Sequence, residues 1–256
     1  MDVLVCVKRV PAPGGKLLLT EDGLSVDTRH LGFTIGPHEE CAVEEAIRIA
    51  AEHGGSVTVL SAGPPETEEQ LRYALSMGAD HGVLAEVGAT ELDPEATAAA
   101  LVETIRTLES ESKPFDLVLF GNETADAGHY QVGVRVACAL GLPIVGGIKG
   151  IELVGGQARV QLKRDVSDGV EVYDTPLPAA AAVKEGLNLP RYPSIKGRLR
   201  AKKAPLRTLR PTPEPGGLRT VRLRQPPEKE HATVVLGHGA EAAEAVVDVL
   251  AEKGLV

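Results

Sequence analysis

The sequence predicts an α/β protein whose core is a doubly wound, mostly parallel β-sheet. Short apolar runs without polar alternation recur along the chain, and stretches with apolar residues at helical spacing lie between them. The composition agrees, since 43% of the 256 residues are hydrophobic but only 3% are aromatic. Continuous apolar runs are typical of strands covered on both faces, and strands that alternate with helices form parallel sheets.

The N-terminal part predicts a strand, a hairpin and a helix. Val3 to Val7 is a continuous apolar run and is expected to be the first strand. Asp22-Gly23 lies between two apolar runs and indicates a hairpin over residues 17–26. A helix should begin at Pro37 and end at Gly54-Gly55. Its apolar side is expected to carry Cys41, Ala42, Ala46, Ile47 and Ala50. Its polar side is expected to carry Glu44, Glu45 and Arg48.

Strands and helices then alternate towards the middle of the chain. Strands are expected at residues 56–61, 82–87 and 116–120, with helices over 66–78, from Asp93-Pro94 onwards and over 130–141. This alternation predicts a Rossmann-like sheet with a ligand crevice at the carboxyl ends of the strands, where the strand order reverses. The strand ends near Cys6, Ala62 and Gly121 should converge at that crevice.

After Pro143 the apolar pattern changes to a period of two. Residues 148–153, 158–166 and 170–177 are expected to form an antiparallel addition to the sheet, followed by a buried run at 179–183. Residues 205–227 are rich in Pro, Gly and Arg, and the tail from Gly239 has the pattern of an amphipathic helix. We therefore expect one domain over 1–204 and, over 205–256, an extended linker with a helical arm that packs on a partner.

The candidate binding site is the loop that follows the strand at 116–120. A strand that ends in Gly121 and continues as a helix presents backbone N–H groups and a helix N-terminus, which together favour an anion. The loop contains no Lys or Arg between Gly121 and Gly133 and lacks a P-loop pattern, so a triphosphate held for phosphoryl transfer is not expected. A monophosphate or the middle of a dinucleotide fits better; an ordinary connection without a ligand is the alternative.

A second candidate site lies in the basic segment 184–203. Pro190 and Pro193 interrupt regular structure, so Tyr192 and Ile195 are expected on a surface loop among basic side chains. An exposed aromatic and an exposed aliphatic residue suggest a docking anchor for a partner protein. The alternative is a loop folded back on its own domain.

Charge and cysteine usage exclude several classes of function. The formal net charge is −9, although ten basic residues face one acid over 196–224. Aromatic residues are absent from that stretch, so nucleic-acid binding is not expected. Cys6, Cys41 and Cys138 lie far apart in the sequence, which argues against a zinc site and against disulfides. Each is expected to be buried, and the protein is expected in the reducing environment of the cytoplasm. The opening MDVLVCVKRV is not expected to be a signal peptide, and no run of the sequence is expected to insert into a membrane.

Five motifs in order carry a resemblance to a known family. They are VLVCVKRV, PHEECAVEEAIRI, SAGPPETEEQLRYALSMGAD, the GxxxxDxxxxQVG pattern at residues 121–133, and LNLPRYPSIKGRLRAKK. With them the chain resembles the beta (small) subunit of electron transfer flavoproteins from Met1 to about Lys203. The resemblance implies an α/β fold of the adenine-nucleotide-binding type in a subunit that carries electrons and is not itself an enzyme.

The resemblance also implies cofactors and partners. An alpha subunit would hold most of a redox-active FAD, and this chain would bury a structural AMP. By position, the nucleotide contacts would come from Cys6, from Gly36, Pro37, His38 and Glu39, from Ala62, and from Gly121, Asn122, Glu123, Thr124, Ala125, Asp126, Ala127, Gly128, His129, Tyr130, Gln131 and Val132. Some members of the family carry a second FAD in place of AMP, and an adenine-nucleotide-using enzyme of similar fold is the alternative outside the family.

In the family, an aliphatic residue at the position of Ile195 inserts into a partner such as an acyl-CoA dehydrogenase. The resemblance therefore implies a partner-binding set made of Arg191, Tyr192, Pro193, Ser194, Ile195 and Lys196. The sequence departs from the common family pattern at residues 36–39, which are Gly, Pro, His and Glu. His38 lies at a position that could approach the flavin held by the partner and affect its potential, and a solvated histidine at the helix start is the alternative.

Overall fold

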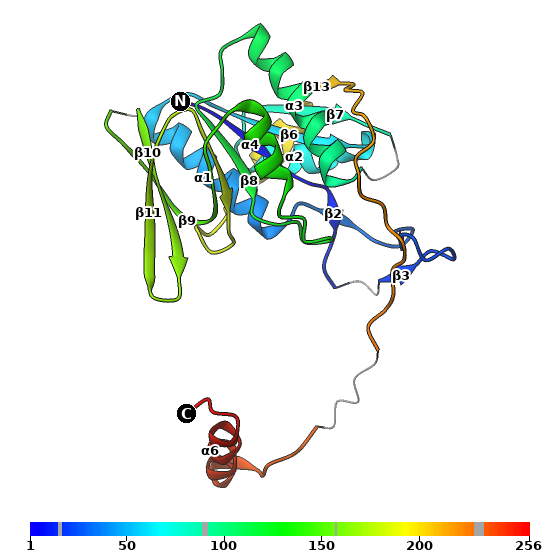
Figure 1. The fold of residues 1–256 in the computed structure, drawn as a ribbon, viewed down its shortest axis with the longest axis vertical. Coiled ribbons are helices and arrows are strands. Elements are labelled where there is room, and N and C mark those ends of the chain that lie inside the picture. Colours follow the sequence, from blue (N-terminus) through cyan, green and yellow to red (C-terminus); the bar gives the residue numbers. More distant parts are fainter. Residues whose placement is uncertain (15–16, 89–91, 157, 228–232) are drawn as a thin grey trace. The chain divides into compact units, whose positions relative to one another are not determined.

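A computed structural model describes residues 1–14, 17–88, 92–156, 158–227 and 233–256 (Figure 1). The described chain forms two compact units, Met1–Val221 and Arg222–Val256. The first unit contains a nine-stranded sheet with strand order β11-β10-β9-β12-β8-β1-β6-β7-β13. These strands are β1 Asp2–Cys6, β6 Ser56–Gly63, β7 His81–Glu86, β8 Leu117–Gly121, β9 Ile144–Val154, β10 Arg159–Val166, β11 Gly169–Pro176, β12 Ala179–Val183 and β13 Leu206–Leu209.

Helices cover both faces of the sheet, as the alternation of strands and helices predicted. Val3 and Val5 of β1 belong to the core that also contains α1 (Pro37–His53) and α2 (Glu68–Met77). Leu4 and Cys6 belong to a second core with α3 (Pro94–Glu111) and α4 (Val132–Leu140). Successive strand residues point to opposite faces, so one apolar strand serves two cores. The doubly wound fold class is confirmed.

The strand order reverses beside β1. The chain runs from β1 outwards to β6 and β7, then crosses to β8 on the other side of β1. β1 pairs in parallel with both β6 and β8. A ligand crevice is expected at such a reversal, outside the carboxyl ends of the strands.

The antiparallel addition is present where period-two patterning predicted it. β10 pairs antiparallel with β9 and with β11, and β9 joins the parallel part of the sheet through β12. The predicted hairpin is also present, since β3 (Leu18–Leu19) pairs with β4 (Val26–Asp27). β2 (Val10–Pro11) and β5 (Phe33–Thr34) form a further antiparallel pair.

Three sequence-based expectations about segments were wrong. The helix expected over 130–141 begins at Val132. Residues 206–209 of the expected linker form β13, which pairs in parallel with β7 at the edge of the sheet. Residues expected in the basic surface loop form α5, Ile195–Lys203, because Pro190 and Pro193 lie before the helix and Ser194 caps its N-terminus.

Two side-chain expectations were also wrong. Glu44 and Glu45 are buried, because segment 184–191 crosses the side of α1 that carries them, and its polar groups bind both carboxylates. Cys138 is exposed, whereas Cys6 and Cys41 are buried as expected. Burial raises the pKa of the Cys6 thiol, so this thiol stays protonated.

Asp93 caps α3 and also holds the chain that leaves β13. Its carboxylate accepts hydrogen bonds from the N–H groups of Ala96 at 2.8 Å and Leu218 at 2.8 Å. We expect Asp93→Ala to lower the free energy of unfolding by about 1 kcal/mol, as the loss of an N-cap acceptor does. Urea unfolding of the purified chain measures this, and Asp93→Asn, which keeps a capping acceptor, should recover most of the loss. An equal loss in both variants would contradict the capping role.

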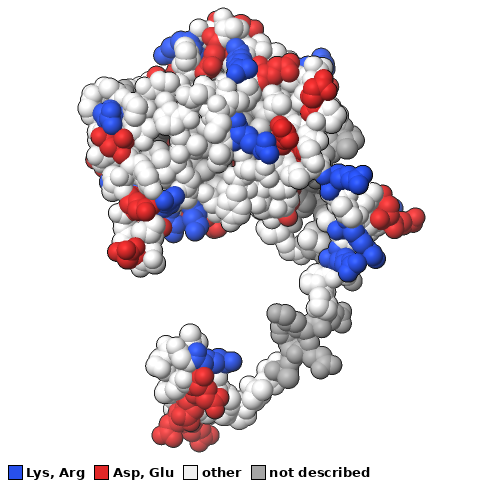
Figure 2. All heavy atoms as spheres, in the orientation of Figure 1, with Lys and Arg blue, Asp and Glu red and all other residues white. Residues whose placement is uncertain are grey.

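The second unit contains the predicted amphipathic helix. A short 3₁₀ turn, η2 (Gly239–Ala242), leads into α6, Ala243–Glu252. Acidic side chains gather on this segment (Figure 2), and they share one face at helical spacing: Glu241, Glu244, Asp248 and Glu252. Val246 and Val247 lie outside that face and are exposed.

In the ranges that the structure describes, no helix is both long enough and apolar enough to span a membrane.

Candidate functional site: the strand ends and the basic docking segment

The structure brings the three predicted strand ends together. Cys6, the last residue of β1, pairs with Leu60 of β6 on one side and Phe120 of β8 on the other. Ala62 lies two residues further along β6, and Gly121 ends β8. All three predicted positions therefore lie at one edge of three adjacent strands.

The start of α1 packs against the loop after β8. A Cβ atom placed on Gly121 would lie 2.8 Å from Cδ of Glu39, and one on Gly36 would lie 2.4 Å from Oε2 of the same carboxyl group. The same position at Gly36 lies 3.6 Å from Cβ of Ala125. Only glycine fits at these two positions without movement, so residues 36–39 and 121–125 form one structural unit.

Glu39 is a buried carboxyl group at the centre of this unit. The side chain is 3% exposed, and its Oε2 atom is buried without a hydrogen-bond partner in the described residues. Burial raises its pKa to about 7 because the ionised form loses hydration. The carboxyl group is therefore partly protonated near neutral pH and can donate or accept a hydrogen bond.

Lys8 brings a cation to the loop from just after β1. Its Nζ atom lies 2.7 Å from Oδ2 of Asp126. Burial raises the pKa of Asp126, but the contact with Lys8 lowers it, and the pKa is lowered on balance. The sequence interpretation considered only residues 121–133 and found no cation there. Lys8 was missed because the chain between strand and loop is long, although its place directly after the first strand could have indicated it.

The loop uses several of its own polar groups to fix its shape. The Thr124 carbonyl and hydroxyl oxygens accept hydrogen bonds from the N–H groups of Gly128 and His129, and Asp126 accepts one from Ala127. Asn122 Oδ1 accepts a hydrogen bond from Gly147 N–H at 2.7 Å. Asn122, Ala127, Gly128 and His129 thus use their N–H groups within the protein, so a ligand would be bound by other donors of the loop.

His38 links the site to segment 184–191. Its Nδ1 atom accepts a hydrogen bond from Glu185 N–H at 2.8 Å, which places the remaining ring proton on Nε2. Nε2 lies 3.3 Å from Oε1 of Glu123. A hydrogen bond to Glu123 also raises the pKa of Tyr130, which is exposed. The alternative of a solvated histidine is wrong, since His38 is buried.

The remaining predicted nucleotide contacts lie at the starts of two helices, α1 and α4. Pro37 opens α1 and Gln131 precedes α4, where Gln131 Oε1 accepts a hydrogen bond from Arg135 Nε at 2.9 Å. Val132 is the first residue of α4 and packs against the second core. Two surface hollows lie elsewhere: one of about 630 Å³ between α3 and α4, and one of about 320 Å³ bordered by α2 and α5.

The basic segment presents apolar side chains to solvent. Leu189, Tyr192 and Ile195 are 91%, 82% and 81% exposed, and Leu199 is exposed one turn further along α5. Arg198 donates a hydrogen bond to the Tyr192 hydroxyl at 2.8 Å, and its guanidinium lies 5.1 Å from the ring centroid. The alternative of a loop whose anchor residues fold back on the domain is therefore wrong for Tyr192 and Ile195.

Helix α5 is fixed on α2 by two arginines that act in opposite directions. Arg72 of α2 donates to the carbonyl groups of Ala201 and Ala204 at the end of α5. Arg200 of α5 donates to those of Leu75 and Ala79 at the end of α2. Cations at helix C-termini are favourable because they neutralise unpaired carbonyl groups. A Cβ atom on Gly197 would lie 2.4 Å from the Ser76 carbonyl oxygen, so glycine permits the close approach.

Comparisons with known proteins cover both regions. An electron transfer flavoprotein domain model matches residues 23–214. The electron transfer flavoprotein subunit beta of Bacillus subtilis is 34% identical over 266 aligned residues that cover all of both chains. The chain belongs to the electron transfer flavoprotein beta subunit family. The corresponding subunit of Syntrophomonas wolfei is 36% identical over 90% of this chain and 87% of its own, and that of Mycobacterium tuberculosis is 35% identical over 79% and 76%.

Family membership places both candidate regions in a protein of electron transport. The matched range includes residues 36–39, the loop after β8 and the basic segment 184–203, and the full-length alignment adds Cys6. The relatives are named as beta subunits of electron transfer flavoproteins. The resemblance drawn from the five motifs is thus confirmed at the level of the family.

Proposed function

We propose that this chain is the beta subunit of a heterodimeric electron transfer flavoprotein, a cytoplasmic electron carrier and not an enzyme. In this proposal it binds a structural AMP, helps an alpha subunit to hold FAD, and passes electrons from dehydrogenases such as acyl-CoA dehydrogenases to a downstream acceptor. The observation that carries the proposal is the exposure of Tyr192 and Ile195 on a firmly held basic segment in a chain of this family.

The strand-end residues are chemically suited to an adenine nucleotide. The unpartnered Oε2 of Glu39 can bind a hydroxyl or amino group of a nucleotide, whether the carboxyl is ionised or protonated. Lys8 and the loop backbone supply positive charge and N–H donors near Asp126. In this proposal the residues named for the family site, Cys6, 36–39, Ala62 and 121–132, would hold AMP. FAD, when bound in the complex, supplies the redox chemistry.

The basic segment 184–203, here called the docking segment, is suited to brief contact with a redox partner. Its apolar side chains form a small patch, and Lys196, Lys202 and Lys203 are exposed around it. Small interfaces are typical of electron-transfer partners, and basic rims accelerate association with acidic surfaces without much gain in affinity. The patch fits a partner with an acidic surface around an apolar pocket.

The test uses the complex formed by co-expression with an alpha subunit. We expect Ile195→Ala to raise the KM for the complex in its reduction by an acyl-CoA dehydrogenase about tenfold or more, as loss of an anchor residue does. Flavin content and Tm should not change, because the Ile195 side chain is exposed. Mass analysis of the released nucleotide should show AMP. A colourless chain that forms no complex, or an unchanged KM, would contradict the proposal.

A further inference from the structure

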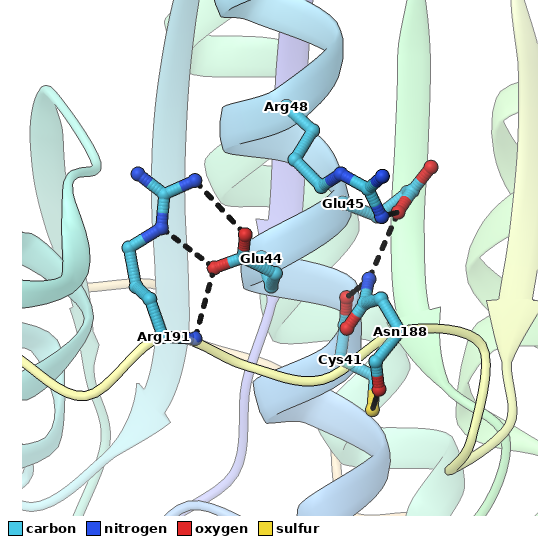
Figure 3. Close-up of polar contacts among 6 residues, drawn as sticks. All are labelled: Cys41, Glu44, Glu45, Arg48, Asn188 and Arg191. Atoms are coloured by element: carbon cyan, nitrogen blue, oxygen red, sulfur yellow. Dashed lines mark hydrogen bonds and ion pairs between the residues drawn. The ribbon is translucent and has the colours of Figure 1, made fainter.

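The carboxylate of Glu44 on helix α1 binds the docking segment through Arg191. Glu44 is 6% exposed, and its two oxygens accept three hydrogen bonds from Arg191 (Figure 3). Oε2 accepts from the backbone N–H at 3.1 Å and from Nε at 2.7 Å, and Oε1 accepts from Nη2 at 2.9 Å. One carboxylate thus fixes both the backbone and the guanidinium of the residue before Tyr192.

A second contact holds the segment three residues earlier. Asn188 Nδ2 donates to the Cys41 carbonyl oxygen at 3.0 Å and to Oε2 of Glu45 at 2.8 Å. Arg48 also lies 3.4 Å from that oxygen. Figure 3 shows both contacts on α1, with Arg191 and Asn188 reaching the helix from the same connecting segment. The segment is therefore attached to α1 at two points before it enters α5.

The arrangement gives Arg191 a role inside its own chain. The Arg191 guanidinium pairs with Glu44 in a two-pronged geometry, and that contact raises the arginine pKa. Its Nε and Nη2 atoms face Glu44 on α1 (Figure 3), so this edge of the guanidinium is already used within the chain. A buried carboxylate such as Glu44 is costly unless it is fully paired. The pairing of Glu44 with Arg191 therefore keeps segment 184–191 against α1.

We propose that Glu44 is a positioning residue for partner docking, acting through Arg191. It fixes the backbone at residue 191 so that Tyr192 and Ile195 are displayed before the partner arrives. A preordered segment binds more tightly because less conformational freedom is lost on association. This inference rests on the proposed docking function and deepens it: Ile195 contacts the partner, whereas Glu44 and Arg191 set its position.

The test is a double-mutant cycle in the assembled, flavin-loaded complex. Glu44→Gln keeps the side-chain shape, removes the charge and offers one acceptor to Arg191 in place of two. We expect Glu44→Gln and Arg191→Gln each to raise the KM for the complex about tenfold in the acyl-CoA dehydrogenase assay, with kcat unchanged. The double variant should be no worse than either single variant, because both remove the same contact.

Two further measurements separate positioning from direct contact. Hydrogen exchange at the Arg191 amide should become faster in Glu44→Gln, whereas Glu52→Gln, an exposed residue on the last turn of the same helix, should change neither exchange nor KM. If Arg191→Gln raises the KM while Glu44→Gln does not, Arg191 contacts the partner directly and the inference fails.

Failure of the inference can be told apart from failure of the proposed function. If Ile195→Ala raises the KM and Glu44→Gln leaves it unchanged with normal flavin content, only the positioning role is overturned. If neither variant changes the KM, docking occurs elsewhere and both are wrong. If Glu44→Gln lowers the flavin content or Tm, the Arg191→Lys variant decides, because it keeps the charge but loses the two-pronged geometry. An unchanged KM in Arg191→Lys overturns the inference, and so does a raised KM with unchanged exchange at the residue 191 amide; a raised KM with faster exchange at that amide supports it.

Discussion

Ile195→Asp should abolish productive docking while leaving the fold intact. The substitution would place a charge in the apolar pocket proposed on the partner, and an unpaired buried charge costs several kcal/mol. We expect the KM for the complex in the acyl-CoA dehydrogenase assay to rise more than about 100-fold. The same change should not destabilise the chain, because Ile195 is exposed and is the first residue of α5.

The position of Ile195 at the first residue of α5 determines the expected effect of the aspartate on stability. An acidic residue in the first turn of a helix is favourable, by about 0.5 kcal/mol, so the free energy of unfolding of Ile195→Asp should equal or slightly exceed that of the original chain. Urea unfolding measures it. Val170→Asp is the matched control, since Val170 is also aliphatic and exposed but lies on β11; its KM should not change. A stable Ile195→Asp complex with normal KM would remove Ile195 from the docking site.

Glu39→Gln should remove one contribution to the pH dependence of stability in the purified chain. The pKa of Glu39 is about 7 in the folded chain against 4.5 for the free side chain. The folded state therefore holds a proton that the unfolded state releases above about pH 4.5, so stability falls as the pH rises from about 4.5 to 7 and is constant above that. At about 1.4 kcal/mol for each pH unit, the decrease amounts to at most about 3.5 kcal/mol.

Urea unfolding at pH 5 and pH 8 tests this directly. Glu39→Gln should be less sensitive to pH than the original chain and relatively more stable at pH 8, because the buried charge is gone. Glu52→Gln on the same helix is the control, since Glu52 is exposed, and it should keep the pH dependence of the original chain. If the difference between pH 5 and pH 8 is the same with and without Glu39, the carboxyl group ionises normally in the folded chain.

The sequence predicted the parts of the fold that depend on local pattern. Apolar runs such as Val3–Val7 indicate strands, and Pro37 at the first helical position and Asp93 at the N-cap indicate where two helices begin; the structure has a strand and two helices there. The meeting of Cys6, Ala62 and Gly121 also followed, because parallel strands that reverse order bring their carboxyl ends together. These inferences need only the periodicity of the chain and the handedness of its connections.

The parts that were missed depend on contacts between distant residues. Helical spacing placed Glu44 and Glu45 on a polar face, and nothing near them indicated that Asn188 and Arg191 would cover it. The approach of Lys8 to Asp126 likewise joins residues more than one hundred positions apart. Strand β13 was missed because Pro-rich surroundings hide a short edge strand that needs only β7 as its neighbour. Such pairings follow from the packed fold and not from local sequence.

The reciprocal contacts between α2 and α5 use backbone carbonyl oxygens of the opposite helix end as acceptors. These oxygens have no proton to gain or lose, so the contacts do not require an ionised acceptor. Every residue carries such an oxygen, so exchanging the side chains of Leu75 or Ala201 would leave the acceptors for Arg200 and Arg72 in place.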